Sequence, residues 1–422
     1  MMKCIVFAVT IAVASCASAQ QPRSSNTDRR LLTGTRIYVA PDAPPLENGW
    51  VLLSGGKIEA VGAASAAKPK GVRTDSACSG GVIAAGFQNN HVHFLDPAFE
   101  NAATRPAADL EQVMTRMLTR YGFTTVVDTA SLVDNTVALR RRIERGDVKG
   151  PAILTVGNAL YPQNGIPIYL RDLPLPLLGQ FAQPVTAGAA IAVVRRNFAL
   201  GANGTKLFIA TPQGNGVITR MSPEIARAAA AETHGRGGLV MAHPTDPEGV
   251  AAAVAAGVDI IVHTAIDGPR PVTWSADLIR DLRAHEVSVV PTLKLWHYEL
   301  DKEKVPTNIQ EIIVGDAQKQ LKAFADAGGQ VLFGTDVGYM SDFDTTDEYV
   351  LMAQAGLTPM QILASLTTAA AARWKAAEHR GRVQAGFDAD LVVLNGDPAT
   401  DVRRFADVKC TLRGGREVFV RN

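Results

Sequence analysis

A His-x-His pair lies in the segment Gly86–Phe94, where His91 and His93 flank a single valine. Side chains two apart in an extended segment point the same way, so both imidazoles would face one point. Neutral imidazoles are common ligands for Zn²⁺, although Mn²⁺, Co²⁺ and Fe²⁺ accept the same donors. One such pair is a weak signal, and it gains weight only if further ligands join it.

Further candidates follow or lie in other apolar segments. His243 follows Gly238–Ala242, His263 follows Asp259–Val262, and Asp336 follows Val331–Thr335. A single histidine or aspartate at a strand end is commonly structural, but four imidazoles and a carboxylate at one edge are hard to explain in that way.

Lys206 lies within the apolar segment Gly204–Ile209, where an unpaired ammonium would be costly. His297 follows another apolar segment and is a candidate substrate contact, whereas the remaining three histidines are expected on helices or loops: His234, His285 and His379.

The elements that would position these residues are alternating strands and helices. Eight Val/Ile-rich segments recur over roughly 300 residues, and continuous apolar segments are typical of parallel strands buried on both faces. The expected strands are 83–87, 124–128, 153–156, 206–209, 239–242, 260–262, 287–290 and 331–333. This alternation of strands and helices is supported by three expected helix starts, each with proline at the first helical position: Ser222-Pro223, Asp246-Pro247 and Thr358-Pro359. The pattern predicts an α/β fold with a (β/α)8 TIM-like barrel. The alternative, a doubly wound open sheet, lacks a glycine-rich phosphate loop after its first strand.

Both ends of the chain carry short β-like segments separated by Gly and Pro, and we expect them to form one small β-sandwich. The predicted organisation is a signal peptide at 1–19, the first part of the sandwich at 20–84, the barrel at 85–380 and the second part of the sandwich at 381–422.

The first 20 residues combine Lys3, the apolar run Ile5–Ala14 and small residues before Gln20, as in a secretory signal. The run is too short for a membrane span. Cleavage before Gln20 predicts a soluble periplasmic or secreted protein, and a lipobox-like pattern around Cys16 leaves a lipid anchor as the alternative. Two other cysteines remain, Cys78 and Cys410, and they predict no disulfide framework.

Charge restricts the partners of the protein. Without residues 1–19 the chain loses one lysine and carries 41 basic and 41 acidic residues. This balance argues against a nucleic-acid partner and leaves a small-molecule substrate. The apolar fraction of 47% excludes a largely disordered chain. The sequence leaves open whether the protein forms a homo-oligomer.

In this combination of motifs the sequence resembles the amidohydrolase superfamily of metal-dependent hydrolases, and within it the imidazolonepropionase-like and Xaa-Pro dipeptidase-like members. The resemblance extends from the first β-like segments through Gly381–Leu394. Ala85 departs from the family, which usually has Pro before the Gly of the His-x-His segment, but the change affects no ligand.

The resemblance implies two divalent metal ions, for which zinc suits the donors. It implies that His91, His93 and Asp336 bind one ion, that His243 and His263 bind the second, and that a carbamate on Lys206 bridges them. Two ions can share a hydroxide and lower its pKa toward 7. As a ligand beside that hydroxide, Asp336 would be the catalytic residue, taking its proton and delivering it to the leaving group.

The substrate would be selected by loops after the strands. The long segment Tyr161–Pro174 offers Tyr161, Tyr169 and Arg171, and Arg220 is a second candidate for a substrate carboxylate. The expected function is exported binuclear hydrolysis of an amide or peptide-like C–N bond, of the dipeptidase or carboxypeptidase type. Hydrolysis of a lactone, ester or phosphotriester is the alternative on the same site, and a non-catalytic exported metal-binding protein is the alternative of another class.

Overall fold

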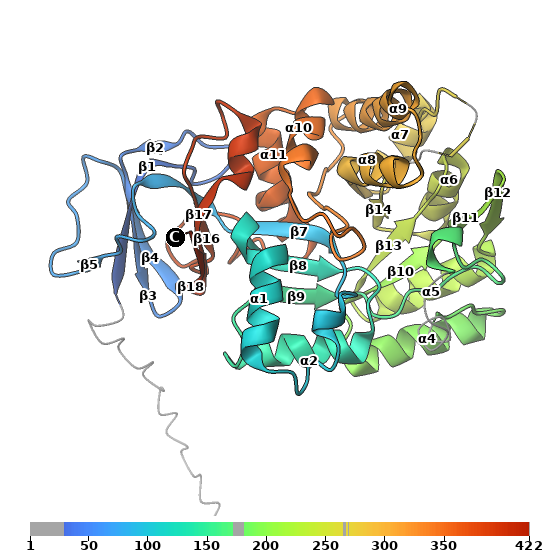
Figure 1. Ribbon diagram of the computed structural model, residues 1–422, viewed down its shortest axis with the longest axis horizontal. Helices are drawn as coiled ribbons and strands as arrows, with labels where there is room; N and C mark the ends of the chain where they lie inside the picture. Colours follow the sequence, from blue (N-terminus) through green and yellow to red (C-terminus); the bar gives the residue numbers. More distant parts are fainter. Residues whose placement is uncertain (1–28, 172–180, 265–266, 269, 422) are drawn as a thin grey trace, which may run out of the picture.

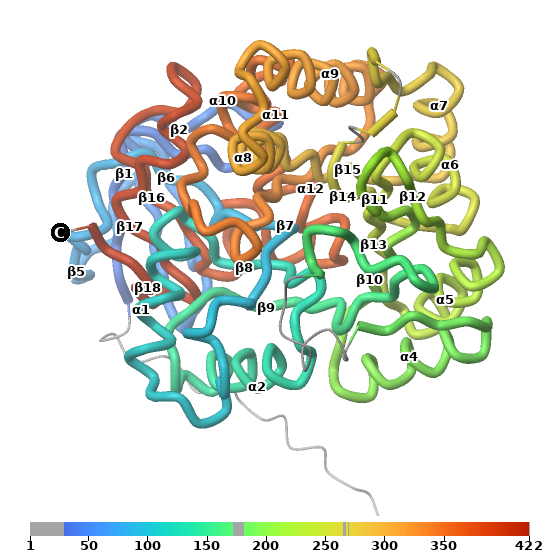
Figure 2. The backbone as a smooth tube through the Cα atoms, turned by 45° about the vertical axis from the view of Figure 1, so that its right-hand side comes forward, coloured from blue at the N-terminus to red at the C-terminus, as the bar shows by residue number. Residues whose placement is uncertain are grey.

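The computed structural model describes residues 29–171, 181–264, 267–268 and 270–421. Within these residues a sheet made from both chain ends lies beside a larger part in which helices surround parallel strands (Figures 1 and 2). The expected signal peptide, including Cys16, lies outside the described residues. None of the described helices is both long and apolar enough to cross a membrane.

The sheet made from both ends, here called the terminal sheet, has the order β18-β17-β16-β6-β1-β3-β4, and β2 and β5 pair with β1. Its neighbouring strands are antiparallel except where β1 pairs with β6 and with β5. Residues from before 86 and after 390 therefore share one sheet. Its strands are β1 (Arg30–Ile37), β2 (Leu46–Glu47), β3 (Trp50–Ser54), β4 (Lys57–Gly62), β5 (Arg73–Thr74), β6 (Gly81–Ala85), β16 (Leu391–Leu394), β17 (Val408–Arg413) and β18 (Arg416–Val420).

A disulfide joins Cys78 to Cys410 across the core of the terminal sheet, with Cα atoms 5.4 Å apart. The sequence analysis predicted no disulfide framework for these cysteines. The structure corrects that view, because Cys78 precedes β6 while Cys410 lies in β17, and the sheet brings them together over a separation of 332 residues. A separation of this size leaves no local spacing pattern that sequence reasoning could use.

The larger part contains two groups of parallel strands, ordered β7-β8-β9 and β10-β13-β14-β15. Parallel bridges continue the pairing from Leu160 to Leu207, from Val289 to Val331 and from Val92 to Val337. The strands are β7 (Phe87–Val92), β8 (Phe123–Asp128), β9 (Ala152–Thr155), β10 (Gly204–Phe208), β13 (Leu239–His243), β14 (Ile260–Val262) and β15 (Ser288–Val290), and a separate hairpin consists of β11 (Ala210–Gly214) and β12 (Val217–Arg220).

The helices lie around the outside of these strands (Figures 1 and 2). Two expected helix starts are confirmed with their caps: Asp246 accepts from the Gly249 amide before Pro247, and Thr358 forms a capping box with Gln361. The α-helices are α1 (Ala107–Met117), α2 (Val133–Glu144), α4 (Ala187–Leu200), α5 (Pro223–Gly235), α6 (Pro247–Ala256), α7 (Ala276–Ala284), α8 (Leu293–Lys302), α9 (Thr307–Asp326), α10 (Thr346–Gln354), α11 (Pro359–Leu366) and α12 (Thr368–Arg373).

The first expected barrel strand, 83–87, was placed wrongly. The structure divides this apolar run at Gly86: β6 ends at Ala85 in the terminal sheet, and β7 begins at Phe87. A Cβ at position 86 would lie 2.3 Å from the Thr124 hydroxyl oxygen, so the close approach to β8 requires glycine here. The run is apolar throughout because both sheets bury it, which hides the boundary from sequence analysis.

Candidate metal centre and active site

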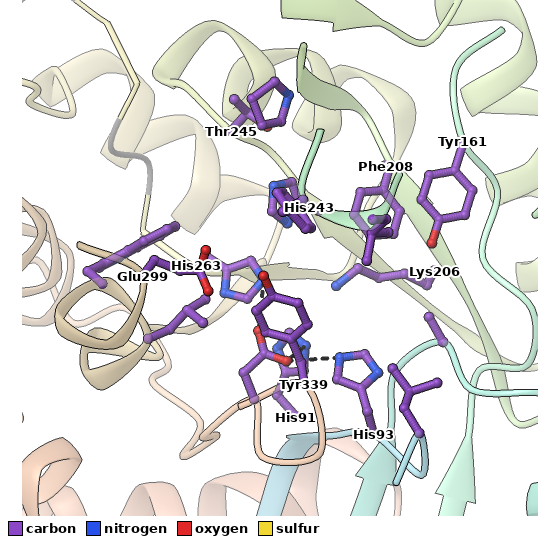
Figure 3. Close-up of a pocket in the computed structure, with 18 of the residues that line it drawn as sticks. His91, His93, Tyr161, Lys206, Phe208, His243, Thr245, His263, Glu299 and Tyr339 are labelled. Atoms are coloured by element: carbon purple, nitrogen blue, oxygen red, sulfur yellow. Dashed lines mark ion pairs between the residues drawn. The ribbon is translucent and has the colours of Figure 1, made fainter. Parts of the chain in front are cut away.

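The residues expected to bind metal come from the carboxyl ends of the parallel strands. His91 lies in β7, Lys206 in β10 and His243 at the end of β13, while His263 follows β14 directly. Asp336 follows the segment that pairs with β15 through Val331. Figure 3 shows His91, His93, Lys206, His243 and His263 pointing into one cavity. The structure therefore brings together all six residues.

Asp336 lies at the centre of this cluster. One of its oxygens, Oδ1, is 2.9 Å from His93 Nε2 and 3.3 Å from His91 Nε2, and Oδ2 is 3.8 Å from His263 Nε2. Single donor atoms of His91, His93 and Asp336 all lie within 4.8 Å of one another. Among the described residues Asp336 Oδ1 is buried with no partner in hydrogen-bond geometry. Two imidazole nitrogens and a carboxylate oxygen that converge without hydrogen bonding fit a bound divalent cation.

The other three residues of the cluster are His243, His263 and Lys206. The His263 ring centroid is 4.8 Å from those of both His91 and His243. Lys206 is 1% exposed, and its Nζ lies 5.5 Å from the centroid of the Phe208 ring. Two imidazoles beside a buried amine fit a second cation only if the amine loses its positive charge.

Burial favours the neutral forms of Lys206 and of three imidazoles in the cluster. Burial lowers the pKa of Lys206 to about 7, against the opposing influence of Asp336. Burial, followed by the nearby Lys206 charge, lowers the pKa of His243 to about 3. Burial also holds the pKa values of His91 and His263 well below the usual range for histidine. At neutral pH these imidazoles have lone pairs free for a metal ion, and a large fraction of Lys206 is the uncharged amine.

The backbone of the site is held in sparsely populated conformations. His263 and Asp336 both have left-handed backbones, with φ of 75° and 64°. Such residues cost about 1–3 kcal/mol each and persist where the surroundings fix them. Here the His91 carbonyl accepts from the Asp336 amide, and His263 Nδ1 is 2.6 Å from the Thr292 hydroxyl at the start of α8. These contacts fix the direction of both side chains.

The cluster opens into a cavity of about 350 Å³. Its walls are mainly aromatic and apolar, and its acidic residues other than Asp336 come from α8, from the position directly after α8 and from the loop after β14. Beyond the six clustered residues, the lining consists of Leu95, Ala130, Tyr161, Tyr169, Leu170, Phe181, Phe208, Pro212, Thr245, Asp267, Leu295, Trp296, Glu299, Glu303 and Tyr339.

Of the five residues expected to contact substrate, the structure places two in the cavity lining and three elsewhere. Tyr161 and Tyr169 line the cavity. Arg171 instead contacts the Gln213 side chain, and His297 lies on α8 outside the lining. Arg220 pairs with Asp246 at 2.6 Å and Glu248 at 2.7 Å, also away from the lining. A role in substrate binding stays a prediction for all five.

Sequence reasoning missed several polar residues of the cavity, among them Trp296, Glu299 and Tyr339. Trp296 and Glu299 are three residues apart on α8 and so share a helical face. Tyr339 follows Asp336 by three residues in the same loop. The sequence analysis expected no helix directly after the strand 287–290, whereas α8 begins at Leu293.

Comparison with known proteins gives the family. The sequence model described as the amidohydrolase family matches residues 82–418. The chain belongs to the amidohydrolase family. It is thus a hydrolase that acts on C–N bonds, and the family resemblance seen in the sequence is confirmed. No curated protein matches the sequence at a significant level.

Three solved structures show how closely the fold is shared. A Xaa-Pro dipeptidase with bound methionine in its active site is 18% identical, with a TM-score of 0.77 over 92% of this chain and 99% of that chain. A. niger ochratoxinase is 20% identical, with a TM-score of 0.77 over 93% and 96%. A prolidase complexed with N-methylphosphonate-L-proline is 24% identical, with a TM-score of 0.74 over 93% and 100%. At these identities the likeness shows the fold alone.

We expect Gly338→Ala to lower metal occupancy of this amidohydrolase. Gly338 has φ of 96°, and a Cβ there would lie 1.9 Å from the His93 carbonyl oxygen, so the substitution must displace His93 or the Asp336 loop. Elemental analysis of the purified variant measures the loss. Gly386→Ala is the matched control, because Gly386 also has a positive φ, 89°, but its Cβ would meet nothing within 4 Å. Equal metal content in both variants would show that this close approach does not position the ligands.

Proposed function

We propose that the protein is an exported, binuclear metal-dependent hydrolase that cleaves an amide or peptide-like C–N bond. The observation that carries the proposal is the convergence of four imidazoles, a buried lysine and one carboxylate at the strand ends. Membership of the amidohydrolase family supports the same reaction class. The solved proteins of similar fold include a Xaa-Pro dipeptidase and a prolidase.

In this proposal His91, His93 and Asp336 hold one divalent ion, and His243 and His263 hold the second. Lys206 would carry a carbamate, formed when its neutral amine adds to CO₂ and releases a proton, and this anion would supply oxygen ligands shared by the two ions. Zinc suits this mixed nitrogen and oxygen donor set. When bound, such a pair of ions supplies a hydroxide nucleophile at neutral pH and polarises the substrate carbonyl.

Asp336 moves the proton in the proposed reaction. Its carboxylate lies between the two groups of imidazoles, and Oδ1 has no hydrogen-bonding partner among the described residues. It accepts the proton of the nucleophile and transfers it to the departing nitrogen. An amide depends on this second transfer more than an ester does, because an amine anion is a poor leaving group.

We further propose that the parallel strands close as a (β/α)8 barrel and that the terminal sheet folds as a sandwich. The three parallel bridges that extend the pairing beyond β9, beyond β15 and back to β7 support closure. Amides of Asn90 and His93 donate to carbonyls of Phe333 and Val337, which supports the same join.

Replacement of Asp336 by Asn tests the reaction. The variant keeps the side-chain volume but removes the proton acceptor, so kcat on the best amide substrate should fall about 10²–10⁴-fold while the fold survives. Substrates come from a screen of the metal-loaded protein against dipeptides, N-acyl amino acids, cyclic imides, lactones and organophosphates. A variant within threefold of the wild-type kcat would rule out this role, and turnover of lactones or organophosphates alone would replace the amide assignment.

Lys206→Ala tests the bridge. Without the carbamate the two ions lose their shared ligand, and the metal content should fall from about two ions per chain toward one, with most activity lost. Added acetate or propionate should restore part of both, because a short carboxylate fits the vacated space. A variant that keeps two ions per chain by elemental analysis, and near-normal activity without added acid, would contradict the binuclear assignment.

Export is supported by the leader-like sequence and by the Cys78–Cys410 disulfide, since disulfides persist mainly in oxidising compartments. We expect protein purified from its source to begin at Gln20 if soluble or at an acylated Cys16 if tethered. Intact-mass measurement distinguishes the two. An unprocessed chain beginning at Met1 in the cytosol would contradict both.

A further inference from the structure

The active-site cavity has an acidic wall, defined here as Asp267, Glu299 and Glu303. Glu299 lies on α8, Glu303 follows the end of this helix directly, and Asp267 lies in the loop after β14. Figure 3 shows Glu299 on the same side of the cavity as His263 and on the opposite side from Tyr161. This wall belongs to none of the roles assigned above, so its charge is available to select the substrate.

Basic side chains are scarce around the same cavity. Among the described residues, Lys206 is the one lysine or arginine in the lining, and it lies in the metal cluster. The undescribed residues 172–180, 265–266 and 269 contain no lysine or arginine in the sequence. Arg220 is paired with Asp246 and Glu248 instead. A substrate carboxylate would therefore meet no guanidinium fork, the usual recognition group for such an anion.

Lys302, a cation outside the lining, does not change this balance. Its Nζ is 3.8 Å from Glu299 Oε1 and 5.6 Å from the centroid of the Tyr339 ring. Its side chain is 52% exposed and lies outside the lining. One solvated ammonium offsets part of the Glu299 charge, and Asp267 and Glu303 still leave an excess of carboxylates.

Glu299 and Tyr339 are neighbouring side chains of the lining, and the Tyr339 hydroxyl interacts with the Glu299 carboxylate. A carboxylate has about four acceptor sites, so Glu299 can also accept a hydrogen bond from a ligand N–H. The aromatic faces of Trp296, Tyr169 and Phe208 add apolar contact area for the rest of the ligand.

We propose, on the basis of the proposed function, that this enzyme takes apolar or aromatic amides without a free carboxylate. The part of the substrate that reaches the acidic wall presents a neutral or cationic N–H group, which donates to Glu299. A free carboxylate at this position would lie among like charges with no lysine or arginine side chain to compensate it, which weakens its binding. The chain would thus act on amidated peptides or similar carboxamides in preference to free dipeptides.

A matched pair of substrates tests this preference. Leucylphenylalaninamide and leucylphenylalanine differ only in the terminal carboxamide or carboxylate, and the metal-loaded full chain should cleave the internal bond of the amidated member with a KM lower by about tenfold or more. Calorimetric titration with the products, phenylalaninamide and phenylalanine, measures the same preference without turnover. Equal or lower KM for the free dipeptide would overturn the inference while leaving the proposed function intact.

Glu299→Gln identifies the group responsible. The amide is nearly the same size as the carboxylate but carries no charge, so the KM of the amidated substrate should rise, that of the free dipeptide should fall, and the ratio should shrink by at least about threefold with a smaller change in kcat. Glu311→Gln, at an exposed site on α9, is the matched control and should leave the ratio unchanged. An unchanged ratio in Glu299→Gln would overturn the role of Glu299. If neither dipeptide is cleaved and the wider amide screen also fails, the proposed function fails instead.

Discussion

Burial of one lysine and three imidazoles beside a single carboxylate is the constraint on which the rest of this structure depends. Left in their charged forms, Lys206 and these imidazoles would repel one another. Burial lowers the pKa values of His91, His243 and His263 and brings the pKa of Lys206 to about 7, which turns a cluster of potential cations into a set of lone-pair donors. The same burial that costs solvation therefore prepares the ligands. Parallel strands make this possible because each contributes one side chain at the same edge.

The terminal sheet contacts the amino ends of β7 and β8, which are the ends away from the metal ligands. The Gly86 amide donates to the Asp390 carbonyl where β6 passes into β7, and the Thr411 hydroxyl in β17 donates to the Thr119 carbonyl just before β8. A Cβ on Gly122 would lie 2.8 Å from Val392 in β16. The start of β7 is thus held by residues from both ends of the chain, and its carboxyl end carries His91. The position of this ligand depends on packing well away from the metal centre.

The metal ligands could be predicted from the sequence because they combine an uncommon set of residue types with one repeated position, the end of an apolar segment. The cavity wall could not be predicted in the same way. Glu299 and Trp296 come soon after the expected strand 287–290, and the structure shows that a helix, α8, begins between them and that strand. Arg220 resembled an anion-binding residue because its partners, Asp246 and Glu248, are 26 and 28 residues away. The division at Gly86 was hidden because both sheets bury the same apolar run.

The disulfide between Cys78 and Cys410 can form only late in the synthesis of the chain. Cys410 comes 332 residues after Cys78, so the bond cannot form until all of the residues between them have been made. The bond then encloses every strand and loop that contributes to the cavity in one covalent ring. A protease that cuts a surface loop inside this ring opens the backbone but releases no fragment. An enzyme outside the cell would in this way keep its catalytic parts tethered to one another after a single cut.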